Sequence, residues 1–181
     1  SVTVVPHSLN EVGGWRCEIS LPHEHSHRSL ADIRAIIDNG SMTDRAKALA
    51  LKAFGVLAEA EGAVHGKEAD TVTFHEVGAL DSMLDTCLAA ALFDRLNPDL
   101  FVCGTLPACD GTVRSTHGRL PVPAPADMKL LRGTPARGSA TSGETRTPTG
   151  VARLKAWDAA YGAWPAITVA YEAPRYAPTA C

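Results

Sequence analysis

The sequence has few of the features that direct a chain to nucleic acid or to a membrane. Its 17 basic and 20 acidic side chains give a net charge of −3, so there is no electrostatic basis for binding nucleic acid. The longest strongly apolar run, Cys87–Phe93, is far shorter than the ~20 residues that a transmembrane helix needs. The amino end lacks a basic segment followed by an apolar one, and we expect no signal peptide there.

Paired cysteines and the common nucleotide motifs are also missing. The five cysteines form no CxxC pair, which favours a reduced, cytoplasmic protein whose thiols are small core side chains. The chain contains no Walker A loop, GxGxxG, GxSxG or HExxH pattern. Any nucleotide would therefore need a different kind of binding site.

The elements that are present predict a single α/β domain. A chain of 181 residues with 45% hydrophobic and 20% charged side chains is large enough for one real core. We expect a mixed sheet with helices packed on it. The predicted strands are 2–5, 15–21, 100–103 and 167–171, and the predicted helices are 29–40, 41–64, 80–96, 125–133 and 147–162. The helix 80–96 is nearly apolar all round, which indicates a central position.

An acidic motif precedes and opens that central helix. His75 and Glu76 come just before it, and Asp81 and Asp85 stand four residues apart in it, so the two aspartates share one helix face. Two interpretations remain open. The carboxylates either stabilise the helix amino end, which accounts poorly for Asp85, or they bind a ligand or metal.

A second motif alternates histidine with other residues. His23, His25 and His27 would point the same way from an extended segment. Such a row can bind nickel or zinc, and the alternative is a polar loop that happens to be rich in histidine.

Two long segments rich in glycine and proline follow the central helix. The first, 107–125, carries Arg114, His117 and Arg119, cations that suit a phosphate or carboxylate ligand. The second, 133–150, resembles a mobile loop or lid. It leads to Thr147-Pro148-Thr149-Gly150, a capped helix start whose N–H groups and hydroxyls could bind an anion.

Together these motifs resemble the LarC family of nickel-insertion proteins. They are the histidine row followed by Arg28-Ser29-Leu30-Ala31-Asp32-Ile33, then Phe74 to Ser82, His117 to Ala126, and Thr147 to Gly150, in the family's order and spacing. Relative to the family, 1–181 corresponds to one LarC-like domain without the amino-terminal segment and the carboxyl-terminal domain. Arg146 also departs from the family, which tends to carry a small or hydroxylated residue there.

The resemblance implies a reaction and a set of roles. The reaction is a lyase-type cyclometallation that inserts nickel, as substrate, into a pyridinium bisthiocarboxylate mononucleotide, driven by CTP hydrolysis with Mn²⁺ or Mg²⁺. The implied catalytic residues are His75, Glu76, Asp81 and His117. The implied substrate-binding residues are Arg114, Arg119, Thr147, Thr149 and Gly150. The implied metal ligands are His75, Glu76, Asp81, Asp85, His23, His25 and His27.

Two alternatives to this reaction stay open. The chain could be a short homologue that acts on another anionic, nucleotide-like substrate without nickel. It could instead be a non-catalytic nickel carrier that uses only the histidine row. The expected partners are a small nucleotide-like substrate and either a missing partner chain or further copies of this chain, with no nucleic acid and no membrane.

Overall fold

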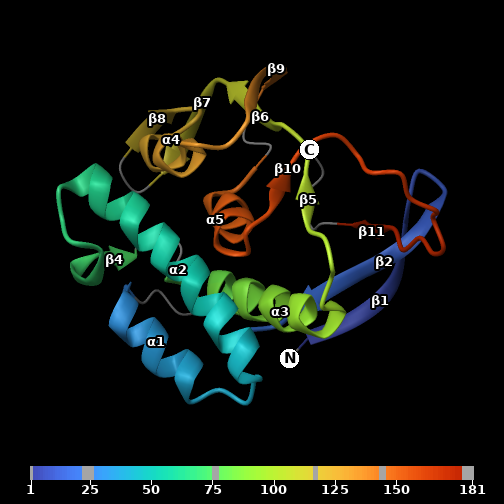
Figure 1. Cartoon of the computed structure of the whole chain (residues 1–181), viewed down its shortest axis with the longest axis horizontal. Helices are drawn as coiled ribbons and strands as arrows, with labels where there is room; N and C mark the ends of the chain where they lie inside the picture. The colour runs from blue at the N-terminus through green and yellow to red at the C-terminus, as the bar shows by residue number, and fades with distance from the viewer. Residues whose placement is uncertain (1, 22–26, 75–77, 116–117, 143–145, 177–181) are drawn as a thin grey trace. The chain divides into compact units, whose positions relative to one another are not determined.

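The structure is a computed structural model of the whole chain, and it describes residues 2–21, 27–74, 78–115, 118–142 and 146–176. Its side-chain description excludes 113–115, 140–142 and 175–176. The chain forms two compact units, 1–24 with 165–181 and 25–164. Each unit is described by itself. Figure 1 shows the elements of both.

The first unit is built on a β-hairpin. Strands β1 (Val2–Leu9) and β2 (Val12–Ile19) pair antiparallel along their whole length, and β11 (Arg175–Tyr176) pairs parallel with β2. Asn10 and Glu11 make the two-residue turn with φ of 48° and 66°, the backbone that such hairpin turns require. The strand predicted near 15–21 is therefore confirmed, and the first strand is longer than predicted.

The strand predicted over 167–171 is wrong. The backbone there has no regular structure, and Ile167, Val169 and Tyr171 are 60%, 70% and 95% exposed. Alternating apolar residues make a strand only where a neighbouring strand supplies hydrogen bonds and a core covers one face. Among the described residues, neither a partner strand nor a covering core lies beside this segment, so no strand forms there despite the alternation.

The second unit holds all the helices that the structure describes. They are α1 (Leu30–Asp38), α2 (Asp44–His65), the 3-10 turn η1 (Ala69–Thr71), α3 (Leu80–Leu96), α4 (Pro125–Leu131) and α5 (Pro148–Ala156). Ser29 caps α1 in the predicted capping box with Asp32. The cap of α2 is Thr43 rather than Ser41, because the Thr43 hydroxyl accepts the Ala46 N–H directly before the first turn.

Helix α2 is the centre of this unit. It contacts each of the other four helices, and Figure 1 shows it running between them. Ala50, Ala53 and Ala58 are fully buried beside Phe54 and Leu57. Small side chains let neighbouring helices approach closely, while the two large ones fill the space between them. The core of the second unit is organised around this helix.

Helix α3 is less central than its composition predicts. Its buried residues are Met83, Thr86 and Ala90, whereas Leu92 and Leu96 are 60% and 77% exposed. An all-apolar sequence does not by itself say which face is covered, and here the neighbours cover only one. Asp85 lies on the exposed face, so its charge is not buried among the leucines that share this face.

The strands of the second unit pair two by two. β3 (Arg28–Ser29) pairs antiparallel with β4 (Thr73–Phe74), and β7 (Thr112–Ser115) with β8 (Gly118–Pro121). β5 (Val102–Cys103) pairs parallel with β10 (Ala160–Tyr161), and β6 (Leu106–Asp110) with β9 (Ala136–Ser142). The α/β class is confirmed, with several small sheets in place of one mixed sheet.

The two glycine- and proline-rich segments contain much of this strand structure. The first supplies β7 and β8 as a hairpin, and the second supplies β9, which the chain reaches from β6 through α4. The prediction that the first segment is ordered is confirmed for its described residues, and β9 replaces part of the predicted mobile loop. Tyr161, predicted in the last helix, lies in β10 instead.

The cysteines and the lengths of the apolar helices bear on two further predictions from the sequence. Cys17, Cys87, Cys103 and Cys109 are free thiols, and burial raises the pKa of the Cys87 thiol, as expected for a cysteine that packs rather than reacts. No helix in the described part of the chain is long and apolar enough to span a membrane.

Candidate functional site

The structure describes only part of the predicted site. His23, His25, His75, Glu76 and His117 lie outside the described residues, and Arg114 is described by its backbone alone. The predicted residues with described side chains are His27, Asp81, Asp85, Arg119, Thr147 and Thr149, together with Gly150.

The two aspartates of α3 have different local roles. Asp81 is in the first turn, where its Oδ1 accepts the backbone N–H of Ser82 at 2.8 Å. A carboxylate at this place satisfies one of the unpaired N–H groups of a helix start. Asp85 lies one turn further on, and its Oδ2 is 2.9 Å from Nη2 of Arg153. The second aspartate therefore pairs with another helix.

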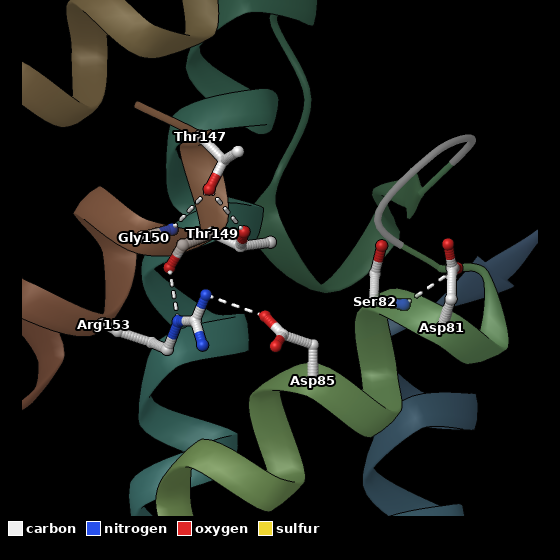
Figure 2. A network of polar contacts seen from close by, with 7 residues as sticks. All are labelled: Asp81, Ser82, Asp85, Thr147, Thr149, Gly150 and Arg153. Carbon is white, nitrogen blue, oxygen red and sulfur yellow. Dashed lines mark hydrogen bonds and ion pairs between the residues drawn. The ribbon is translucent and has the colours of Figure 1, made fainter. Parts of the chain in front are cut away.

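Arg153 is the residue that sequence reasoning missed. It lies in the second turn of α5, and its Nε donates to the carbonyl oxygen of Thr149 at 3.2 Å while its Nη2 faces Asp85. Figure 2 shows the guanidinium between Thr149 and Asp85. Its spacing of four from Thr149 is visible in the sequence and puts both on one helix face. That this face meets α3 is decided by the packing of the helices.

The helix start at Thr147 forms as predicted. The Thr147 hydroxyl accepts the N–H of Gly150 at 3.2 Å and lies 3.0 Å from the Thr149 hydroxyl, with Pro148 at the first helical position. These two threonines and Arg153 lie on the side of α5 that faces Asp85 (Figure 2). The structure thus brings together two predicted motifs, the aspartates of α3 and the start of α5.

The β7–β8 hairpin carries two of the predicted binding residues, Arg114 and Arg119. Arg114 and Arg119 are directly paired across β7 and β8, and the Nε of Arg119 donates to the hydroxyl of Thr112 at 3.0 Å. Among the described side chains, no hydrogen bond or ion pair joins Arg119 to Asp85 or Thr147. Its place in the same binding site stays a prediction.

A buried charge cluster supports the segment that leads to Thr147. Arg146 donates from Nη1 to the carbonyl of Pro107 in β6, and its buried Nε and Nη2 have no hydrogen-bond partner among the described residues. Asp127 of α4 is 2% exposed, and within the described part of the chain its Oδ1 has no hydrogen-bond partner either. Burial raises the pKa of the Asp127 carboxyl, while the charge of Arg146 and the N–H of Ala124 oppose the rise and Glu61 adds to it. The charge of Arg146 thus offsets part of the cost of burying Asp127.

A hydrogen bond links the segment after the histidine row to the segment that precedes α3. Nη1 of Arg28 in β3 donates to the carbonyl oxygen of Gly78 at 2.7 Å, and Arg28 pairs with Phe74 across β3 and β4. Gly78 is buried, and a Cβ there would lie 2.9 Å from the Phe74 oxygen. This position requires glycine because the backbone of β4 is too close for any side chain.

The described residues alone do not complete a metal site. No group of three or more His, Cys, Asp or Glu side chains among them is placed to hold a metal ion. Asp81 and Asp85 are oxygen donors of the kind that a hard divalent ion prefers, and His75 and Glu76 lie outside the described residues. The metal roles of these four residues stay predictions.

The fold and these contacts define an α/β protein in which a carboxylate helix and a capped helix start are joined by an arginine. The family model described as nickel insertion protein matches residues 1–173. The chain therefore belongs to the nickel insertion protein family.

Its relatives have consistent names. A pyridinium-3,5-bisthiocarboxylic acid mononucleotide nickel insertion protein of Nocardioides sp. is 40% identical over 85% of this chain and 39% of its own length. A provisionally named nickel insertion protein of Geobacter metallireducens is 43% identical over 93% of this chain and 43% of its own length. The chain thus spans about two fifths of the length of these relatives. No solved structure matches it.

Proposed function

We propose that this chain takes part in inserting nickel into pyridinium-3,5-bisthiocarboxylic acid mononucleotide. The family match over residues 1–173 supports the general reaction, and the substrate is the one named for the relative from Nocardioides. The structural observation that carries the proposal is the contact of Arg153 with Asp85, 2.9 Å long. It joins the aspartate helix to the threonine helix start, so two motifs far apart in the sequence lie at one place.

The proposed roles follow the chemistry of each group. Nickel is the substrate metal, and the imidazoles of the histidine row would collect it. A Mn²⁺ or Mg²⁺ ion bound by carboxylates would neutralise the triphosphate of CTP as co-substrate. Its proposed ligands are His75, Glu76, Asp81 and Asp85. The proposed ligands for the phosphate or thiocarboxylate groups are Arg114, Arg119, Thr147, Thr149 and Gly150.

The bond that forms sets a requirement for a base. A nickel–carbon bond replaces a ring C–H bond, whose electron pair becomes the new bond while its proton leaves. An imidazole with a pKa near neutrality suits the transfer of that proton. We assign this role to His117, with His75, Glu76 and Asp81 as the remaining members of the catalytic group, because an imidazole bound to a metal ion has no free lone pair to accept a proton. The overall reaction would be of the lyase type and would take place in the cytoplasm.

Nickel incorporation into the mononucleotide tests the proposal directly. The purified chain is incubated with substrate, Ni²⁺, CTP and Mn²⁺, and the nickel-containing product is measured by mass spectrometry. The relative from Nocardioides serves as the positive control. We expect product with the wild-type chain and at least a ~100-fold lower rate for His117→Ala, the loss typical of a removed acid–base group. His75→Ala should lower the rate as well, because it removes a proposed metal ligand. No product from this chain where the relative gives product would overturn the proposal for the chain on its own.

A further inference from the structure

We propose that Arg153 is a positioning residue whose guanidinium is a resident counter-ion of Asp85, so that a divalent cation that binds Asp85 competes with the guanidinium for the carboxylate. This inference rests on the proposed function, because it takes Asp85 as a ligand of the divalent ion. It adds a control on that ion that the family assignment does not contain.

The carboxylate of Asp85 is already in contact with a positive charge, the guanidinium of Arg153. Arg153 Nη2 is 2.9 Å from Asp85 Oδ2, within the distance of a charge-assisted hydrogen bond. The same guanidinium donates from Nε to the carbonyl oxygen of Thr149. Two contacts from one planar group fix its orientation, so the positive charge is held against the carboxylate rather than left free in solvent.

The exposure of the two partners decides which of them an ion can reach. The side chain of Asp85 is 54% exposed, whereas that of Arg153 is 19% exposed. The carboxylate is therefore open to an incoming ion, and the guanidinium approaches it from the protein side. An ion that binds both carboxylate oxygens has to displace the guanidinium from Oδ2, and an ion that binds the other oxygen still meets the positive charge of Arg153.

The strength of the pair makes this exchange possible. An ion pair with a half-exposed partner is weak because water and salt screen it, so its loss changes an affinity only about 1.5- to 5-fold. Removing the positive charge of Arg153 also removes its repulsion of the divalent ion. Taken together, the two effects predict an affinity about three to ten times higher without the guanidinium.

A purely structural role for Arg153 predicts something different. The ring of Phe93 in α3 also packs beside that of Trp157, which directly follows α5, with centroids 4.8 Å apart. Trp157 also donates to the carbonyl of Leu49 in α2. The two helices therefore stay together when Arg153 is replaced. If Arg153 only ties them, its loss lowers stability and leaves ion affinity unchanged.

Binding of Mn²⁺ to the full chain, measured by the electron paramagnetic resonance signal of the free ion, separates these cases. The variants are Arg153→Gln, Arg153→Lys, Asp85→Asn and the double variant Arg153→Gln/Asp85→Asn. The matched control is Arg45→Gln, which removes an arginine that pairs with Asp94 of α3 at 3.4 Å and gives the same change of net charge.

We expect Arg153→Gln to bind Mn²⁺ three to ten times more tightly, Arg153→Lys to bind like the wild type, and Arg45→Gln to change affinity less than twofold. Asp85→Asn should weaken binding, and the gain from Arg153→Gln should vanish in the double variant. An unchanged affinity in Arg153→Gln overturns the inference, and so does a gain that persists without Asp85. The nickel incorporation assay is independent of this result, so a chain that inserts nickel without this pattern refutes the inference alone.

Discussion

Arg28 donates a hydrogen bond of 2.7 Å to the carbonyl oxygen of Gly78, across 50 positions of the sequence. It ties the segment after the histidine row to the start of the aspartate helix. The donor is charged and partly buried, so the bond belongs to the stronger class of side-chain contacts. Arg28 also stands in β3, whose partner β4 leads into the segment that precedes α3. Two motifs of this sequence are thus fixed to each other by one side chain.

Replacing Arg28 by alanine should destabilise the second unit. The Gly78 carbonyl loses a charged donor, and we expect a loss of about 1.5–3 kcal/mol in the free energy of unfolding. Urea denaturation followed by circular dichroism measures it. Arg34, an exposed arginine of α1, supplies the control, and Arg34→Ala should change stability by no more than about 0.5 kcal/mol. Equal effects of the two variants would contradict the importance of the Gly78 contact.

Gly78 and Gly55 should respond to alanine in opposite directions. A Cβ on Gly78 would lie 2.9 Å from the Phe74 oxygen, whereas one on Gly55 in α2 meets nothing within 4 Å. We expect Gly78→Ala to cost about 1–3 kcal/mol through steric strain. Gly55→Ala should stabilise by about 0.5–1 kcal/mol because alanine is the better helix former. Thermal unfolding of both variants tests the pair, and a stable Gly78→Ala protein would show that β4 can move away.

The capping box of α1 should be visible in the titration of Asp32. Hydrogen bonds from the Ser29 side chain and backbone lower the pKa of the Asp32 carboxyl. Because the folded pKa lies below the unfolded one, the carboxylate favours folding above the unfolded pKa of ~3.9, and this contribution is lost as pH falls through the folded value. In Ser29→Ala the pKa of Asp32 should rise, as measured by NMR of the carboxyl carbon. An unchanged pKa would mean that the box does not form in solution.

Asp127 should show the opposite dependence on pH. Burial raises its pKa, with Arg146 opposing the rise, so the folded state holds the proton more tightly than the unfolded state. The ionised group then weakens folding as pH rises above the unfolded pKa of ~3.9. Asp127→Asn cannot ionise, and its stability relative to the wild type should increase between pH 4 and pH 7. Urea unfolding across this range measures the difference, and a constant difference would exclude a raised pKa.

Replacing the histidine row distinguishes the hypothesis of a nickel carrier from that of a catalyst. The triple variant His23→Ala/His25→Ala/His27→Ala removes three imidazoles that could bind nickel. We expect tightly bound nickel, measured by inductively coupled plasma mass spectrometry, to fall to background. Nickel incorporation at saturating Ni²⁺ should change less than about threefold, because a catalytic site does not need a store when free metal is abundant. If the triple variant incorporates no nickel under these conditions, the result favours the hypothesis that the chain is a nickel carrier.

Some features of the fold could be predicted because they depend on neighbours in the sequence. The Ser29 capping box and the Thr147 cap with Pro148 were correct, since side chain and backbone are three residues apart. The hairpin strand at Trp15 was visible in its alternation. The prediction of a strand over 167–171 is wrong because a strand depends on a partner strand as well as on its own sequence. Its apolar residues alternate, but no partner strand lies beside them in the described residues. The helix over 80–96 forms with the predicted bounds, but it is not buried on all sides, because hydrophobic content does not say which face is covered.

The candidate site divides in the same way. The sequence by itself determined which side chains share a helix face or cap a helix start, namely the aspartates one turn apart on α3 and the hydroxyls at the start of α5, because helical spacing alone sets these positions. Only the tertiary structure decided that the two meet, and that Arg153 is the side chain between them. The contact joins residues 68 positions apart, 85 and 153, and no local pattern encodes it. It exists because α2 packs against both helices and so brings them side by side.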